Sequence, residues 1–212
     1  MKLYDYFRSS AAYRVRIALN LKGLTAEREF VHLRNGAHRE ADYMTVNPAG
    51  LVPSFTDGDM TIAQSLAIIE YLDEVHPEPP LLPGSAADRA RIRSISQQIA
   101  ADIHPLNNLR ILEYVDKDLG AGSEGRMTWI HHWIHAGFRG LEVQLANDAE
   151  TGLYCHGDTP TLADICLVPQ VFSGQRFEVD LSPYPKIMEI FDRLHALPAF
   201  ADAAPGKQPD AE

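Results

Sequence analysis

Two serines stand near the start of the chain, between a strand-like run and a helix-like run in YFRSSAAYRVRIALN, residues 6–20. Ser9 or Ser10 at the first turn of a helix would lie beside unpaired backbone N–H groups and the positive end of the helix dipole. That environment stabilises an anion such as a thiolate, a carboxylate or a phosphate. The alternative is structural, because serine is a common helix N-cap. The stretch has no cysteine, no histidine and no glycine-rich loop, so a nucleophile at this turn must come from outside it.

A second polar set surrounds a Val-Pro pair and the helix that follows it. Val52 and Pro53 open the strand-like LVPSF, and Gln64 and Ser65 precede the apolar run LAIIEYL. A cis Val52–Pro53 bond would expose the backbone of Val52 to an extended peptide, and the second helix N-terminus would suit a carboxylate. Taken singly, each feature is also explained by a proline at a strand end and an ordinary N-cap.

Three arginines stand beside small or apolar neighbours: Arg8, Arg110 and Arg176. A guanidinium group binds a carboxylate through two parallel hydrogen bonds, so three of them meeting near Ser9 would make a site for a dianion. The alternative is that they are ordinary surface arginines, and nothing in their local sequence requires them to converge.

Other reactive side chains have simpler interpretations. His131 and His135 share a helix face, but no glutamate follows the first histidine, so the zinc-protease motif is absent and we expect no metal site. Thr161, three residues before Asp164, predicts a capping box with a structural role. Cys155 and Cys166 are most simply packing residues of a reduced protein, and a disulfide between them stays an alternative.

Strand and helix patterns alternate over the first 80 residues. KLYDYF and AEREFVHL are strand-like, and the hairpin signal TDGD joins LVPSF to MTIAQ. Helices are predicted from Ala11 to Lys22, ended by Gly23, from Arg39 to Val46, and from a cap at Ser65. This last helix carries the apolar stripe Ile68, Ile69, Leu72 and Val75. The order predicts a small mixed sheet with helices packed against it.

A proline-rich linker divides this part from an all-helical one. The strand patterns stop at HPEPPLLPGSAAD, and helical stripes follow, interrupted at Pro105. The first stripe comprises Ile92, Ile95, Ile99 and Leu106; the second comprises Met127, Ile130, Ile134, Phe138, Leu141 and Leu145. Two more helices are predicted at 161–176 and 186–196. We therefore expect domains at 1–80 and 88–212, joined by a linker at 81–87.

Composition excludes several classes of protein. With 212 residues, of which 45% are hydrophobic and 23% charged, the chain is typical of a globular protein. A formal net charge of −10 argues against binding to a nucleic-acid backbone. No apolar run reaches the ~18 residues that cross a bilayer, and the N-terminus lacks a signal-peptide core. These features predict a cytoplasmic protein that does not bind membranes.

The motifs together resemble one family. YFRSSAAYRVRIALNLKG is similar to the zeta-class glutathione transferase signature Ser-Ser-Cys-x-x-Arg-Val-Arg-Ile-Ala-Leu. NPAGLVPSF, AQSLAIIEYLDE, the proline-rich linker and GDTPTLADICLVPQ follow in the family's order over nearly the whole chain. The resemblance implies a thioredoxin-like α/β N-terminal domain, an all-helical C-terminal domain, a homodimer and glutathione as cofactor.

The resemblance also assigns roles to residues. It implies that Ser9, next to Ser10, hydrogen-bonds the glutathione sulfur, and that His38 lies near the glycyl end. It places the backbone of Val52 against the cysteinyl unit and Gln64 and Ser65 at the γ-glutamyl carboxylate. His104, Asn108 and Arg110 would border the active site.

The chain departs from the family pattern at two positions. Ala11 stands where the signature has cysteine, and Tyr13 where a tryptophan is usual. A thioredoxin Cys-x-x-Cys is missing as well, because the corresponding residues are Ser9, Ser10, Ala11 and Ala12. The chain thus has no thiol of its own at this turn, and the resemblance implies that glutathione supplies the nucleophile.

The resulting hypothesis is glutathione-dependent cis–trans isomerisation of maleylpyruvate to fumarylpyruvate in gentisate-type aromatic degradation. The thiolate would add to the cis double bond and leave after rotation, while Arg8, Arg110 and Arg176 hold the carboxylates and the charge on the ketone oxygen. The polar segment NNLR favours this short dianion. The alternatives are maleylacetoacetate isomerisation in tyrosine degradation, general glutathione conjugation, and a non-catalytic module with the same fold.

Overall fold

The computed structural model describes all residues, 1–212, and the chain divides into two compact units. The first unit comprises Met1–Leu81 and Ala196–Glu212, and the second comprises Leu82–His195. No helix in either unit combines the length and the apolar character needed to span a bilayer.

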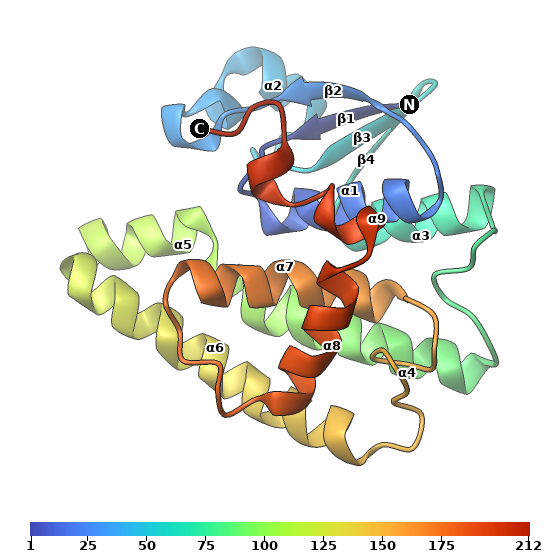
Figure 1. Ribbon diagram of the computed structural model, residues 1–212. Helices are drawn as coiled ribbons and strands as arrows, with labels where there is room; N and C mark the ends of the chain where they lie inside the picture. The colour runs from blue at the N-terminus through green and yellow to red at the C-terminus, as the bar shows by residue number, and fades with distance from the viewer. The chain divides into compact units, whose positions relative to one another are not determined.

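The first unit is built on a four-stranded mixed sheet (Figure 1). The strands are β1 (Lys2–Asp5), β2 (Glu27–Phe30), β3 (Ser54–Asp57) and β4 (Met60–Ala63), in the order β2-β1-β3-β4. β1 and β2 are parallel, whereas β3 pairs with β1 and β4 in antiparallel fashion. The predicted hairpin is confirmed: two residues link β3 to β4, and Gly58 takes a φ of 56° there.

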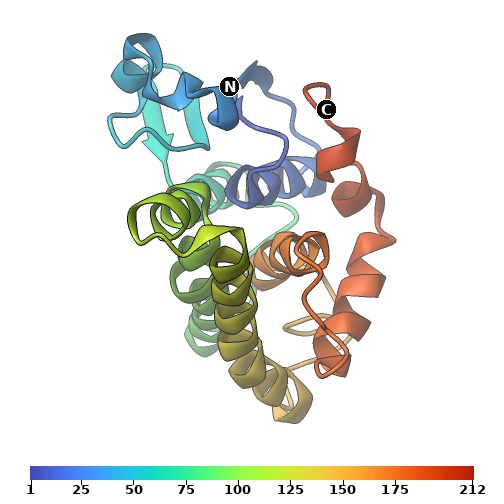
Figure 2. The ribbon, with the colours of Figure 1, turned by 90° about the vertical axis from the view of Figure 1, so that its left-hand side faces the viewer.

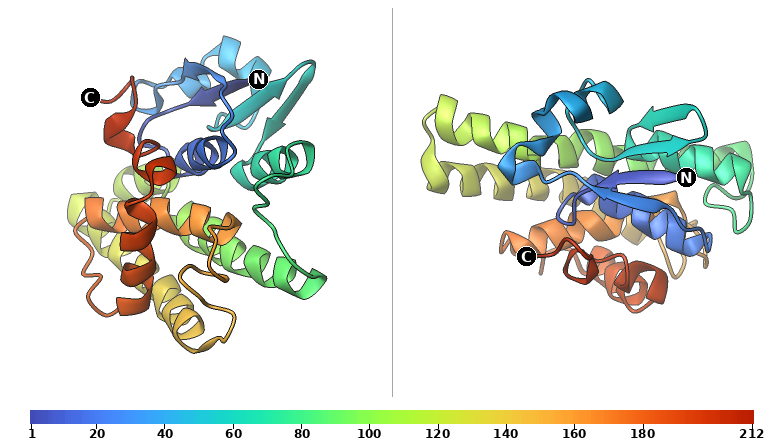
Figure 3. Two further views of the ribbon diagram at one scale, coloured as in Figure 1. Left: turned by 45° about the vertical axis from the view of Figure 1, so that its right-hand side comes forward. Right: turned by 90° about the horizontal axis from the view of Figure 1, so that it is seen from above.

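Helices cover both faces of this sheet (Figure 3). They are α1 (Ser10–Leu21), α2 (Ala41–Val46) and α3 (Ser65–Val75). Leu3 and Phe55 are register partners and fully buried, on the side of α1 and α3. The alternate residue, Tyr4, points the other way, and its ring contacts that of Tyr43 in α2. These are the sheet and helices of the thioredoxin-like fold that the sequence predicts.

The apolar stripe of α3 is confirmed in part. Ile68, Ile69 and Leu72 are buried, but Val75, at the end of the helix, is 46% exposed. Helix α1 ends as predicted, with Gly23 in the left-handed region at φ 64° just after the helix.

The final segment corrects the predicted domain division. Residues 196–212 were expected in the helical domain, but they belong to the first unit. They form α9 (Pro198–Ala201) and the 3-10 helix η6 (Pro205–Lys207). The phenol of Tyr13 and the side chain of Asn20, both in α1, donate hydrogen bonds to the carbonyls of Phe200 and Ala199. The sequence pattern did not reveal this return, because these contacts join residues nearly two hundred positions apart.

The second unit is entirely helical, as predicted, and Figure 2 shows its long helices packed together. The α-helices are α4 (Ala86–Gln97), α5 (Leu109–Glu113), α6 (Gly122–Asn147), α7 (Leu162–Arg176) and α8 (Pro185–His195). The stripe of α6 forms core as expected, since its residues from Ile130 to Leu145 are buried while Met127 is half-buried.

The chain leaves regular α-helix geometry ahead of Pro105, where the sequence predicts an interruption. Regular α-helix ends at Gln97, and the π-helical segment η3 (Gln98–Ile103) and the 3-10 helix η4 (His104–Asn107) follow. A second π-helical segment, η5 (Tyr114–Asp118), follows α5. Because proline has no N–H to donate, regular helical bonding cannot continue through position 105.

Thr161 and Asp164 form the predicted capping box at the start of α7. Asp164 Oδ2 accepts hydrogen bonds from the backbone N–H and the hydroxyl of Thr161, and Oδ1 accepts from the N–H of Cys155. Both cysteines are buried free thiols, so the disulfide alternative is excluded. Burial raises the pKa of the Cys155 thiol well above its ordinary value, so this thiol is unreactive at neutral pH.

A glycine allows α6 to approach η3 closely. A Cβ atom built on Gly137 would lie 2.3 Å from side-chain atoms of Ile103, which is buried and β-branched, whereas one on Gly140 would meet nothing within 4 Å. Only at the first position, therefore, does packing require glycine.

Gly137→Ala should lower the free energy of unfolding by about 1–3 kcal/mol, because the added methyl group overpacks against Ile103. Gly140→Ala is the matched control and should raise it by about 0.5–1 kcal/mol, as alanine favours helix. Chemical denaturation of both variants measures the difference, and equal effects would contradict this account of the packing.

Candidate functional site

Ser9 is the N-cap of α1 and lies in extended conformation at φ −70° and ψ 114°. Its Oγ accepts the backbone N–H of Ala12 at 3.1 Å, which confirms the structural interpretation. A serine hydroxyl that accepts a hydrogen bond still has its own proton to donate, so this bond leaves Ser9 able to donate to an anion. The first turn of α1 contains no acidic residue that would oppose binding of an anion at the positive end of the helix dipole.

Tyr13 is excluded as a second hydroxyl donor at this turn. It is 1% exposed, and its phenol donates to the carbonyl of Phe200 at 3.1 Å. Burial raises the pKa of Tyr13 to about 12, so the group stays neutral. The tyrosine that replaces the family's tryptophan is thus a packing residue.

Val52 lies next to the sheet but outside it. The β1–β3 register ends with Tyr4 opposite Ser54, and the Val52–Pro53 bond is cis, as the sequence predicts. The preceding carbonyl, of Leu51, accepts hydrogen bonds from the phenol of Tyr43 and the amide of Asn47. The segment is therefore held in place while the peptide groups of Val52 stay outside the β1–β3 ladder.

Gln64 and Ser65 do begin a second helix, but the predicted cap at Ser65 is wrong. Gln64 is the residue before α3, and Ser65 is the first helical residue. The Oγ of Ser65 instead accepts a hydrogen bond from Nη1 of Arg14 at 3.2 Å. Gln64 has a φ of 75° and a ψ of 117°, a strained backbone for a residue with a side chain, and its carboxamide is exposed.

Arg14 and Arg16 are positioning residues that the sequence analysis did not single out. Arg14, buried in α1, donates a hydrogen bond to the first residue of α3. This bond fixes the position of the α3 N-terminus relative to α1. Arg16 donates from Nη2 to the carbonyl of Phe7 at 3.0 Å and from Nη1 to Asp5 at 2.8 Å. The available signal was two arginines within an otherwise apolar helical run, since a buried arginine must have buried partners.

His38 lies in the 3-10 helix η2 (Ala37–Arg39) and is 8% exposed. Gly50 approaches it closely: a Cβ atom there would lie 3.1 Å from the carbonyl oxygen of His38, and its φ is 59°. The glycine of NPAG therefore allows the His38 segment to pack against the turn that leads to Val52. The 3-10 helix η1 (Leu33–Asn35) precedes this segment.

Four of the remaining predicted site residues lie in the second unit, in two segments. His104 begins η4, and Asn108 caps α5 by accepting the N–H of Ile111, so Arg110 sits exposed in the first turn of α5. Arg176 is exposed in the last turn of α7, with its guanidinium carbon 4.3 Å from the ring centroid of Phe177.

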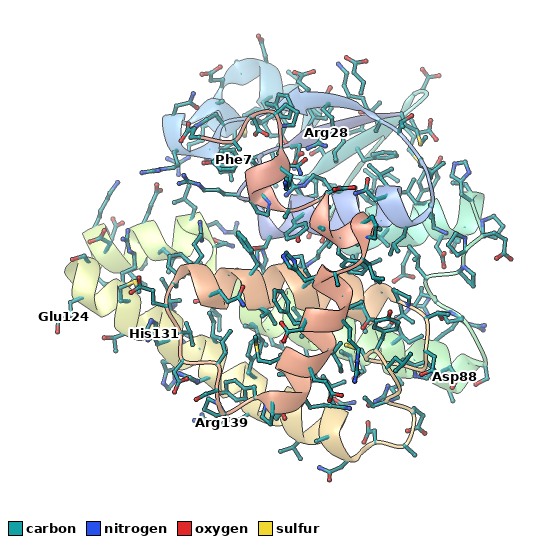
Figure 4. All side chains as sticks on the ribbon, viewed as in Figure 1. Phe7, Arg28, Asp88, Glu124, His131 and Arg139 are labelled. Carbon is teal, nitrogen blue, oxygen red and sulfur yellow. The ribbon has the colours of Figure 1, made fainter.

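Helix α6 fixes both segments. Trp129 Nε1 donates to the carbonyl of Leu106 at 2.8 Å, and His131 Nε2, labelled in Figure 4, lies 2.8 Å from the carbonyl of Phe177. Two side chains of α6 thus anchor the segment before Arg110 and the residue after Arg176. The sequence analysis considered His131 only as a metal ligand, and nowhere do three histidine, cysteine or acidic residues gather in a geometry suited to a metal ion.

Within the first unit, Arg8 directly precedes Ser9, and its guanidinium carbon lies 4.8 Å from the ring centroid of Phe7. The structure places Arg8, Ser9, Ser10, His38, Val52, Gln64 and Ser65 in this unit. His104, Asn108, Arg110 and Arg176 belong to the second unit. The residues predicted to bind glutathione thus belong to the first unit, and Arg110 and Arg176 belong to the second.

Comparison with known proteins agrees with this geometry. Residues 1–74 match the model of the glutathione S-transferase N-terminal domain. A probable maleylacetoacetate isomerase of Vibrio cholerae is 52% identical, covering 99% of this chain and 97% of the relative. A holo maleylpyruvate isomerase, described as a bacterial zeta-class glutathione transferase, superposes with a TM-score of 0.98 at 48% identity over 100% of both chains.

A third relative shows a ligand. The maleylacetoacetate isomerase of Methylobacterium extorquens AM1, solved with malonate and glutathione, superposes with a TM-score of 0.97 at 39% identity over 100% of both chains. The chain belongs to the glutathione transferase family, in its zeta class of maleylacetoacetate and maleylpyruvate isomerases.

The residues of the first unit fit glutathione, the cofactor of this family. A tripeptide with two carboxylates and a thiol needs an extended backbone partner, a site for each anionic end and a donor for the sulfur. The backbone of Val52 would serve as the partner, the start of α3 with Gln64 would take a carboxylate, and Ser9 would be the hydroxyl donor.

Gln64→Gly should stabilise the fold by about 1 kcal/mol, because relief of backbone strain exceeds the entropy cost of glycine. The same change should weaken glutathione binding, since the carboxamide is lost. Gln64→Ala is the matched control: it removes the carboxamide but keeps the strain, so affinity should fall with no gain in stability. Denaturation and calorimetric titration test both variants, and a Gln64→Gly protein no more stable than Gln64→Ala would contradict the assignment of strain.

Proposed function

We propose that this chain is a glutathione-dependent cis–trans isomerase that converts maleylpyruvate to fumarylpyruvate. The observation that carries the proposal is the hydroxyl of Ser9 at a helix N-terminus whose first turn has no acidic residue, in a turn with no cysteine. Such a turn is suited to stabilising a thiolate that the protein does not itself provide.

Bound glutathione would supply a thiolate able to add reversibly to a conjugated double bond. The part played by the chain is to bind and to orient. Val52, Gln64 and Ser65 would hold the peptide, with His38 near its glycyl end and Ser10 at the turn. Ser9 would keep the sulfur ionised through its hydrogen bond, assisted by the dipole of α1.

Arg8, Arg110 and Arg176 would bind the carboxylates of the substrate and stabilise the charge that develops on its ketone oxygen. The exposure of Arg110 and Arg176 leaves their guanidinium groups able to reach a ligand. His104 and Asn108 would shape the same region, as the segment that carries them is anchored by Trp129. The malonate bound by the Methylobacterium relative is itself a short dicarboxylate, which supports a dianion as substrate.

Maleylacetoacetate is the second candidate substrate. It carries a longer keto-acid tail, and the relative that is 52% identical is described as a probable maleylacetoacetate isomerase. We favour maleylpyruvate because its shorter dianion suits carboxylate binding by arginine at both ends. The same assay ranks the two compounds.

We also propose that the protein acts as a homodimer in the cytoplasm. A groove of about 330 Å³ between η3 and α6 is lined by Trp133, Gly137 and Gly140, and Val143 on the same helix is 63% exposed. Gln98 and Asp102 also line this groove, and its apolar part together with Val143 supports pairing with a second copy, which sedimentation equilibrium measures. The cytoplasm keeps glutathione reduced, in keeping with the two free cysteines.

The protein should convert maleylpyruvate only when glutathione is present, and free thiol should remain undiminished because the cofactor is regenerated. Absorbance follows the conversion, and a thiol assay follows the glutathione. Stoichiometric loss of thiol would indicate a conjugating transferase instead. No reaction with maleylpyruvate or maleylacetoacetate would overturn the proposal.

Arg110→Lys serves as the variant for this assay and Arg139→Lys, at an exposed site on α6 (Figure 4), as its control. Lysine keeps the charge but loses the two-pronged hydrogen bond. We expect kcat/KM to fall by about tenfold or more for the first and to stay unchanged for the second. A smaller loss would remove Arg110 from the substrate site.

A further inference from the structure

The backbone of the turn that carries Arg8 and Ser9 is hydrogen-bonded to a residue close to the C-terminus. The N–H of Phe7 donates to Oδ2 of Asp210 at 2.9 Å, although the two residues are 203 positions apart. The carbonyl of Phe7 is held by Arg16, and that of Tyr6 accepts the N–H of Ser9 at 2.9 Å. The N–H and the carbonyl of Phe7 therefore both have hydrogen-bond partners. One of these partners, Asp210, belongs to the C-terminal segment.

The C-terminal segment, residues 203–212, is itself held by hydrogen bonds. The side-chain nitrogen of Gln208 donates to the carbonyls of Asp202 and Ala204. Its side-chain oxygen accepts a hydrogen bond from Nη2 of Arg28 at 3.2 Å. Nε of Arg16 donates to the carbonyl of Ala203 at 2.9 Å. The same guanidinium thus binds both the C-terminal segment, at Ala203, and the turn before Ser9, at Phe7.

Charge favours this arrangement. Burial lowers the pKa of Arg16 to about 10, and the nearby Asp210 carboxylate opposes that shift. Arg16 therefore stays charged at neutral pH and attracts the Asp210 carboxylate. At the very end of the chain, Glu212 Oε1 lies 2.6 Å from Nε2 of His32, and the ring of His32 contacts that of Tyr6.

We propose that the C-terminal segment is a latch and that Asp210 is a positioning residue for Ser9. Asp210 touches neither glutathione nor substrate in this account. It fixes the position of the Phe7 peptide group. That peptide group in turn fixes the turn that carries the Ser9 hydroxyl. The proposal rests on the proposed function only for its catalytic consequence, since the latch itself is a property of the free protein.

Asp210→Ala removes the acceptor of the Phe7 N–H, and Asp210→Asn keeps an acceptor oxygen at the same place. Asp202→Ala is the matched control, because it removes an exposed carboxylate from the same part of the chain without contact to the turn. Hydrogen–deuterium exchange over residues 6–13 should be about tenfold faster in Asp210→Ala, and unchanged in Asp202→Ala. Asp210→Asn should restore most of the protection.

Catalysis supplies the second readout. Relative to Asp210→Asn, which loses the same negative charge but keeps the acceptor, Asp210→Ala should show an acidic limb of the kcat profile at higher pH, because a displaced Ser9 stabilises the thiolate less well. At neutral pH, kcat should fall about tenfold. A loss of folded protein would lower the rate without moving the pH profile, so this readout separates positioning from simple destabilisation.

Unchanged exchange over residues 6–13 in Asp210→Ala would overturn the proposal, as would faster exchange spread evenly over the first unit or an unmoved pH profile. If the unmodified protein neither binds glutathione nor isomerises either substrate, the proposed function fails instead. The exchange experiment then still decides whether the latch exists.

Discussion

The buried ion pair between Arg16 and Asp5 is the interaction on which the first unit depends. Their side chains are 2% and 0% exposed and lie 2.8 Å apart. A charge so deeply buried must be compensated, and removal of one partner of such a pair typically costs about 3–5 kcal/mol. Arg16 meets this requirement with the Asp5 carboxylate and the carbonyls of Phe7 and Ala203. The end of β1, the turn that follows it, helix α1 and the returning end of the chain are thereby joined at one guanidinium group.

The hydrogen bonds of Arg16 hold the N-terminus of α1 in place. Ser9 satisfies one backbone N–H of α1 and retains a proton to donate. Arg14 links α1 to the start of α3, where Gln64 keeps a strained backbone and an exposed side chain. Strain at an exposed residue lowers stability, and such strain is commonly retained where a ligand requires the geometry. These features support the proposal that the two helix starts form a pair of anion sites, one for a sulfur and one for a carboxylate.

Much of this could be predicted from the sequence, for local reasons. The hairpin at Gly58, the end of α1 at Gly23, the capping box at Thr161 and the interruption at Pro105 all follow from the chemistry of a few adjacent residues. The errors involve distant partners. Ser65 looked like a cap because serine before an apolar run usually is one, yet its hydroxyl is taken by Arg14, 51 positions away. Residues 196–212 continue a helical region in sequence, and only their contacts with α1 assign them to the first unit. Tyr13 could be identified as a departure from the family pattern, but only its buried bond to Phe200 shows that it is a packing residue.

The central claim is that the turn at Ser9 activates a thiol that the protein lacks, and the pKa of glutathione bound to the protein tests it most directly. Thiolate absorbance, titrated against pH at saturating protein, gives this value. We predict a pKa clearly below the ~8.5 of a free thiol, a return toward that value in Ser9→Ala, and retention of the low pKa in Ser9→Thr, which keeps the hydroxyl. A bound thiol that titrates like a free one, or one whose pKa is the same in Ser9→Ala, would contradict the account.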